Sequence, residues 1–288
     1  MATLVRSSAL HASLLRLELS ERSRKFASAH GFPSQLSHGS SPVVVYPPCG
    51  MLHGNFFPES YAAILMNPPW KKRLTKVHTS DSLPRADRRW CELDSCNSSD
   101  ALLMNIFCCP ESFADGRLLA LLGVENGTPE FGLKARVPLR EGKFDRTEVD
   151  MRLGDLLVEA KLTEADFQSK PKEVVDRYRD FETVFRRRDL PQSKTSYGSY
   201  QLIRNVLAAF ALNCSFCVML DARRPDLVEQ WYAVMRCVKI GDLAVRSKVL
   251  TWQELSEALP SDLQDFLDEK YGIRPGPITP YEFEHLQH

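Results

Sequence analysis

Apolar positions follow two spacings along this chain, one typical of helices and one typical of strands. Three- and four-residue spacing predicts helices at residues 14–27, 171–188, 197–213 and 227–238, and at a buried segment that begins near residue 98. Short apolar or alternating runs predict strands at residues 131–139, 144–152, 156–164, 214–222 and 247–252. Helices interleaved with strands after a strand meander indicate an α/β fold class, with a mixed central sheet flanked by helices.

Breaks in these patterns suggest how the chain is divided. Residues 31–42 are rich in Gly, Ser and Pro, which marks a loop after the first helix. We therefore expect a flexible N-terminal arm, residues 1–45, and one domain, residues 46–288. Within that domain, residues 43–89 are irregular and contain prolines, and we expect them to wrap the core.

Composition leaves the class of partner open. The 288 residues are 43% hydrophobic, enough for a buried core, and 37 basic residues balance 37 acidic ones. A net charge of zero neither requires nor excludes a nucleic-acid partner, because local clusters of charge decide binding. The clearest basic clusters lie at residues 85–89, 170–179 and 186–188, and a solvated helix face is the ordinary explanation of such a run.

Cysteine use and hydropathy indicate a cytoplasmic protein. The eight cysteines form no disulfide framework, and Cys214 and Cys217 make a CxxC inside an apolar run that predicts a buried strand. No apolar run approaches the ~18 residues that a membrane span needs, so we expect no membrane partner.

A Gly-Asp pair at residues 154–155 predicts a two-residue hairpin turn. Such a turn sets Asp150 opposite Glu159 and Glu148 opposite Lys161. Alternation along the two strands then places all four charged side chains on one face.

This arrangement predicts a metal site. Two carboxylates opposite each other on adjacent strands lie only ~5 Å apart at Cβ and repel, which favours a cation between them. Mg²⁺ binds one or two carboxylates together with water and phosphate oxygens. Lys161 would lie beside the ion. The alternative is an ordinary amphipathic hairpin, but apolar residues such as Val149 and Leu162 make both of its faces partly apolar.

Asp150, eight intervening residues, and Glu-Ala-Lys at residues 159–161 resemble the signature of the PD-(D/E)XK nuclease superfamily. The order of helix, three-stranded meander, helix and strand is similar to its common core. More narrowly, residues 88–273 resemble the PGN_0703-like restriction-endonuclease-like proteins, above all in the hairpin TEVDM and LLVEAKLTEADF.

The resemblance implies a restriction-endonuclease-like core and a nuclease that hydrolyses phosphodiester bonds, with DNA as the substrate and Mg²⁺ or Mn²⁺ as the cofactor. It implies that Asp150 and Glu159 are metal ligands and that Lys161 is the catalytic lysine. Glu148 shares their predicted face and is a further candidate.

Two further positions follow from the resemblance. Glu92 would add an acidic ligand to the metal, and Gln201 corresponds to the glutamine of a QxxY helix in related exonucleases. Arg204 stands where the tyrosine of that motif would be. A surface acid and a helix-packing amide are the structural alternatives for Glu92 and Gln201.

Two other functions are alternatives to a nuclease. The chain could keep the nuclease fold as an inactive nucleic-acid-binding or structural protein. Asn67 opens an Asn-Pro-Pro-Trp segment that resembles the base-binding loop of amino-DNA methyltransferases. No glycine-rich cofactor loop accompanies it, and the same segment is a plain turn.

Overall fold

The computed structural model describes residues 2–39, 41–78 and 84–276, and the chain forms two compact units. The sheet unit comprises residues up to 12, 122–220 and 224–250. The helical unit comprises residues 13–121, 221–223 and those from 251 onward. The whole predicted hairpin, including Asp150, Glu159 and Lys161, therefore belongs to the sheet unit.

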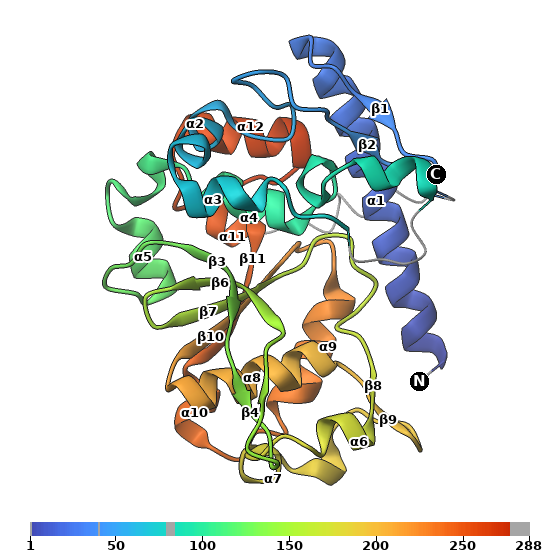
Figure 1. The fold of residues 1–288 in the computed structure, drawn as a ribbon, viewed down its shortest axis with the longest axis vertical. Coiled ribbons are helices and arrows are strands. Elements are labelled where there is room, and N and C mark those ends of the chain that lie inside the picture. The colour runs from blue at the N-terminus through green and yellow to red at the C-terminus, as the bar shows by residue number, and fades with distance from the viewer. Residues whose placement is uncertain (1, 40, 79–83, 277–288) are drawn as a thin grey trace. The chain divides into compact units, whose positions relative to one another are not determined.

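A five-stranded sheet is the centre of the sheet unit (Figure 1). Its strands are β3 (Glu130–Lys134), β6 (Glu148–Leu153), β7 (Leu156–Ala160), β10 (Ser215–Leu220) and β11 (Ser247–Thr251). The strand order is β11, β10, β7, β6, β3. β6 runs antiparallel to β3 and to β7, whereas β10 runs parallel to β7. The predicted α/β fold with a mixed sheet flanked by helices is confirmed.

The predicted hairpin between β6 and β7 is also present. Its register pairs Met151 with Val158 and Leu153 with Leu156. Gly154 has a φ of +58°, and a Cβ added there would lie 2.7 Å from the backbone oxygen of Asn126. Only glycine fits this turn without strain, and the turn fixes the register of the whole hairpin.

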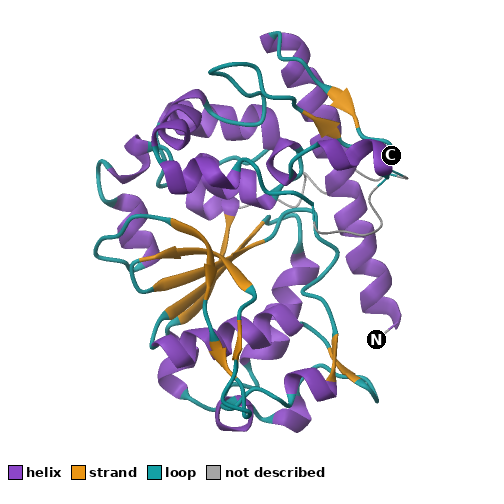
Figure 2. Cartoon of the chain, viewed as in Figure 1, coloured by secondary structure: helices purple, strands orange, loops and turns teal. Residues whose placement is uncertain are grey.

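Helices and short strands complete the sheet unit. They are β4 (Val137–Pro138), β5 (Phe144–Asp145), β8 (Lys170–Pro171), α6 (Lys172–Val175), α7 (Phe181–Val184), η4 (Arg187–Asp189), β9 (Ser196–Tyr197), α8 (Tyr200–Leu212), α9 (Pro225–Met235) and α10 (Gly241–Val245). Figure 2 shows the pair β8 and β9 apart from the main sheet. The core of this unit joins buried apolar residues of β7, β10, α8 and α9.

The prediction of a single helix at residues 171–188 is wrong, because the structure divides this segment into α6, α7 and η4. Its periodic apolar residues are buried, as Val175 and Phe181 show. The backbone between them forms hydrogen bonds to residues 138–140, since Arg179 N donates to Pro138 O and Arg140 N donates to Arg177 O. Hydrogen bonds to a distant segment thus replace the helical ones.

The helical unit contains α1 (Ala2–His30) from residue 13, β1 (Gln35–Leu36), β2 (Val44–Val45), α2 (Pro58–Met66), α3 (Pro68–Arg73), η1 (Arg85–Arg89), η2 (Glu92–Asp94), α4 (Ser99–Phe107), η3 (Pro110–Phe113), α5 (Arg117–Leu122), α11 (Trp252–Ser256) and α12 (Ser261–Tyr271). The predicted helix near residue 98 is present, and the Ser98 side chain caps it by accepting from Ala101 N. Among the described helices, none is both long and apolar enough to cross a membrane.

Residues 43–89 are more regular than predicted, since α2 and α3 lie within them. Each begins at a proline, Pro58 or Pro68, and proline suits the first turn of a helix because it needs no N–H donor there. The predicted division into residues 1–45 and 46–288 stays a prediction, and residues 277–288 of it lie outside the described residues.

Candidate active site

Asp150 and Glu159 lie next to the last residue pair of the β6–β7 hairpin. The register ends with Met151 paired to Val158, and each acid is the next residue beyond that pair. Asp150 is half-buried, and its Oδ2 accepts a hydrogen bond of 2.8 Å from Ala160 N. Two carboxylates therefore lie at the end of the ladder, where β7 leaves β6.

Lys161 forms a buried ion pair with Glu159. Its Nζ lies 2.7 Å from Glu159 Oε1, and the two side chains are 5% and 1% exposed. The backbone N–H of Lys161 donates to Met219 O, so β10 holds the residue in extended backbone. Residues 159 and 161 point to the same side of the strand because side chains alternate.

Two residues of α8 complete the surroundings of Glu159. Asn205 Nδ2 donates to Glu159 Oε2 over 2.6 Å. The guanidinium of Arg204 lies 3.7 Å from the same oxygen, donates to Asn205 Oδ1 over 2.8 Å, and donates to the backbone oxygen of Glu148 over 3.0 Å. Both Arg204 and Asn205 are buried, so their contacts with each other and with Glu159 lie away from water.

These contacts decide the charge state of the pair. Burial by itself would raise the pKa of Glu159, but Lys161 and Arg204 outweigh it and hold that pKa below its usual value. Burial would likewise lower the pKa of Lys161, but Glu159, Glu164 and Asp150 outweigh it and raise that pKa. Both groups are therefore charged at neutral pH. Lys161 and Arg204 thus supply part of the positive charge that the two acids are predicted to require.

Sequence reasoning did not identify Arg204 and Asn205 as site residues. Arg204 departs from the QxxY pattern in sequence, yet its guanidinium lies directly beside Glu159. A signal was present, because an adjacent Arg and Asn interrupt an otherwise apolar helix, YQLIRNVLAAFAL. Buried polar side chains of this kind need partners, and such partners are often functional groups.

Gln201 lies one turn before Arg204 and Asn205 and so shares their face of α8. Its backbone N–H donates to Phe167 O. Its side-chain Oε1 is buried, and it has no hydrogen-bond partner within the described part of the chain. A buried acceptor without a donor is costly, and a ligand or water that donates to it would remove the cost.

Glu148 and Glu92 are placed differently from the hairpin pair. Glu148 is half-buried on β6 opposite Lys134 of β3, and its backbone oxygen accepts from Arg204. Glu92 belongs to the helical unit, where its carboxylate accepts from Lys76 Nζ over 3.0 Å. Burial foremost raises the pKa of Glu92, and Lys76 opposes that shift. A role for either residue in metal binding stays a prediction.

The carboxylates of Asp150 and Glu159 suit a magnesium ion whose coordination shell also includes water and substrate oxygens. Among residues 2–39, 41–78 and 84–276, no three His, Cys, Asp or Glu side chains are grouped closely enough to hold a metal ion. Mg²⁺ does not require such a group, since one or two carboxylates with water and phosphate oxygens suffice. Asp150 and Glu159 carry carboxylate oxygens of the kind that Mg²⁺ binds, and both oxygens of Glu159 accept hydrogen bonds, from Lys161 and from Asn205.

The other sequence motifs have structural roles. The Asn67 side chain caps α3, since its Oδ1 accepts from Trp70 N over 3.3 Å. The Asn-Pro-Pro-Trp segment is therefore a helix start, which accounts for it without a base-binding loop. Cys214, just before β10, and Cys217 within it are buried, and neither forms a disulfide.

Comparison with known proteins identifies the family. The sequence model of the family described as restriction endonuclease associating with ARP matches residues 22–272. No curated protein and no solved structure matches the chain. Because the match covers most of the chain, this protein belongs to the family of restriction endonucleases associating with ARP.

Proposed function

We propose that this protein is a metal-dependent nuclease of the PD-(D/E)XK type, which hydrolyses phosphodiester bonds of DNA with Mg²⁺ or Mn²⁺. Family membership supports nuclease activity. The observation that carries the proposal further is the buried pair of Glu159 and Lys161 beside Asp150. A buried ion pair is a poor source of stability compared with apolar residues of the same size, so its presence in the core favours a chemical use.

Asp150 and Glu159 would hold the ion, which when bound supplies positive charge to the phosphate and lowers the pKa of a water molecule. Asn205 donates to one oxygen of Glu159 and Lys161 to the other, so the carboxylate has one orientation. Fixed ligands of this kind favour a defined metal geometry.

Lys161 acts in this proposal as a cation. Its raised pKa keeps the ammonium protonated at neutral pH, so it donates hydrogen bonds and does not accept the proton of water. It stabilises the negative charge that accumulates on the phosphate in the transition state. Arg204 is a positioning residue, because it keeps Glu159 ionised and contacts it beside Asn205.

A cleavage assay with a matched lysine control tests the proposal. Wild-type protein should cut supercoiled plasmid or single-stranded DNA with Mg²⁺ or Mn²⁺, and EDTA should stop it. Lys161→Met should lose cleavage, whereas Lys248→Met on the edge strand β11 should keep it. DNA binding without cleavage by the wild type, under all metal conditions, would instead support a nucleic-acid-binding or structural protein that keeps the fold.

A further inference from the structure

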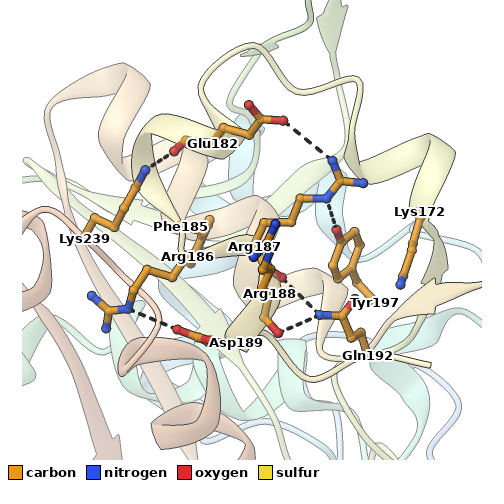
Figure 3. A pocket seen from close by; sticks show the side chains of 10 residues that line it. All are labelled: Lys172, Glu182, Phe185, Arg186, Arg187, Arg188, Asp189, Gln192, Tyr197 and Lys239. Atoms are coloured by element: carbon orange, nitrogen blue, oxygen red, sulfur yellow. Dashed lines mark hydrogen bonds and ion pairs between the residues drawn. The ribbon is translucent and has the colours of Figure 1, made fainter. Parts of the chain in front are cut away.

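The sheet unit has a second feature that the catalytic proposal does not use, a pocket of about 840 Å³ lined by α7, η4 and β9 (Figure 3). Five of its side chains are cations, namely Lys172, Arg186, Arg187, Arg188 and Lys239. Only two carboxylates, Glu182 and Asp189, line the same pocket. We name it the basic pocket. Its charge is strongly positive although the whole chain is neutral.

Two of the five cations are neutralised by neighbours. Arg186 lies 3.4 Å from Asp189, and Arg187 lies 2.7 Å from Asp176. Arg187 Nε also donates to the hydroxyl of Tyr197 over 2.7 Å. Arg187 is thus held between a carboxylate and the hydroxyl of a buried tyrosine.

The other three cations have no ion pair within the described residues. Lys172 Nζ lies 5.4 Å from the centroid of the Tyr197 ring, and Lys239 Nζ donates to the backbone oxygen of Glu182. Arg188 is exposed, and its backbone oxygen accepts from Gln192. Three unneutralised cations around one pocket repel one another, and an anion removes that repulsion.

The basic pocket and the candidate active site belong to the same compact unit. Tyr197, which lines the pocket, and Gln201 of α8 are four residues apart, so their Cα atoms lie at most ~14 Å from each other. Lys170 of β8 pairs with Tyr197 of β9, and its Nζ lies 5.9 Å from the centroid of the Tyr200 ring.

We infer that the basic pocket binds the backbone phosphates of a nucleic acid. This inference rests on the proposed nuclease function for the identity of the anion. Arg and Lys side chains contact phosphate without reading sequence, so the pocket positions the substrate strand and does not select a base.

Equilibrium binding of a fluorescent 30-base-pair duplex in EDTA tests the inference without cleavage. The pocket variant is Lys172→Gln with Lys239→Gln. The control is Lys25→Gln with Lys143→Gln, which removes the same charge from two lysines that are 76% and 75% exposed. Each lost phosphate contact should reduce the slope of log K against log salt by about 0.9, so the slope of the pocket variant should be smaller by about 1.8. With equal binding at 1 M salt, this slope change makes binding roughly 60-fold weaker at 0.1 M salt. The control should match the wild type.

Equal slopes for the pocket variant and the control would overturn the inference. Unchanged DNA binding together with weaker binding of a polyglutamate peptide would also overturn it, and would assign the pocket to an acidic protein segment. The two proposals fail separately. If the wild type binds DNA through the pocket but cuts none with Mg²⁺ or Mn²⁺, the nuclease function fails and the pocket stands. If cleavage depends on Lys161 while the pocket variant behaves as the control, the pocket inference alone fails.

Discussion

The pair of Glu159 and Lys161 should show a large coupling free energy in unfolding experiments. Both side chains are almost fully buried and 2.7 Å apart, so removing one charge leaves the other in the core without its partner. Lys161→Met leaves Glu159 with the hydrogen bond from Asn205 and with Arg204 at 3.7 Å. Because these partners remain, we expect Lys161→Met to lower the free energy of unfolding by about 3 kcal/mol, the lower end of the range for breaking a buried ion pair.

Glu159→Gln leaves Lys161 with an amide acceptor and with the more distant charges of Glu164 and Asp150. Because the amide oxygen can still accept a hydrogen bond from Lys161, we expect this variant to be destabilised by about 2 kcal/mol, the scale of a hydrogen bond to a charged group. The double variant removes both charges, so it should cost only about 2 kcal/mol and give a coupling free energy near 3 kcal/mol. Urea unfolding of the four proteins, followed by circular dichroism, measures all of these values.

The coupling should also depend on pH in a defined direction. The folded pKa of Glu159 is lowered, so its contribution is present above the unfolded value near 4.5 and is lost as pH falls through the folded pKa. The folded pKa of Lys161 is raised, so its contribution is lost only as pH rises above the unfolded value of 10.5. The coupling should therefore be constant from about pH 6 to 9 and decline in acid. Additive effects of the two substitutions at pH 7 would refute this reasoning.

Two other substitutions separate metal binding from stability, and a third tests the cost of a buried charge. Asp150→Asn should weaken Mn²⁺ binding in calorimetry by more than about tenfold yet change stability by no more than about 1 kcal/mol, because an amide oxygen can still accept from Ala160 N. Arg204→Gln should destabilise the fold by about 2 kcal/mol but strengthen Mn²⁺ binding several-fold, since it removes a cation beside Glu159; weaker Mn²⁺ binding would contradict this. In the helical unit, burial lowers the pKa of Lys270 to about 7, so the penalty of charging it is full below pH 7 and disappears as pH rises to 10.5. Lys270→Met removes this penalty but also removes the hydrogen bond to Gly54 O. The net effect should be a free energy of unfolding about 2 kcal/mol higher at pH 6, with no increase above pH 10.5.

The sequence predicted features whose causes lie within a few residues. The Gly-Asp turn at 154–155 fixed the hairpin register, because a two-residue loop leaves little choice of pairing. The capped helix at Ser98 followed from the same kind of local rule. The mixed sheet followed from the order of these elements.

Features that depend on distant contacts could not be predicted in this way. The break between α6 and α7 arises because residues 177–179 bond to residues 138–140, about forty positions earlier. Asn205 contacts Glu159 only because α8 packs against β7. A pattern of apolar positions shows that a face is buried, but it does not show which strand covers it.

Metal-dependent cleavage by the Glu159→Gln, Lys161→Met double variant tests the central claim most directly. The unfolding cycle predicts that this variant stays folded, so a loss of activity cannot come from a loss of structure. Under single-turnover conditions with Mn²⁺, the wild type should convert supercoiled plasmid to nicked or linear DNA, and the double variant should be at least ~10³-fold slower. Cleavage by the folded double variant at the wild-type rate, or wild-type cleavage that persists in EDTA, would contradict a metal-dependent nuclease centred on Asp150, Glu159 and Lys161.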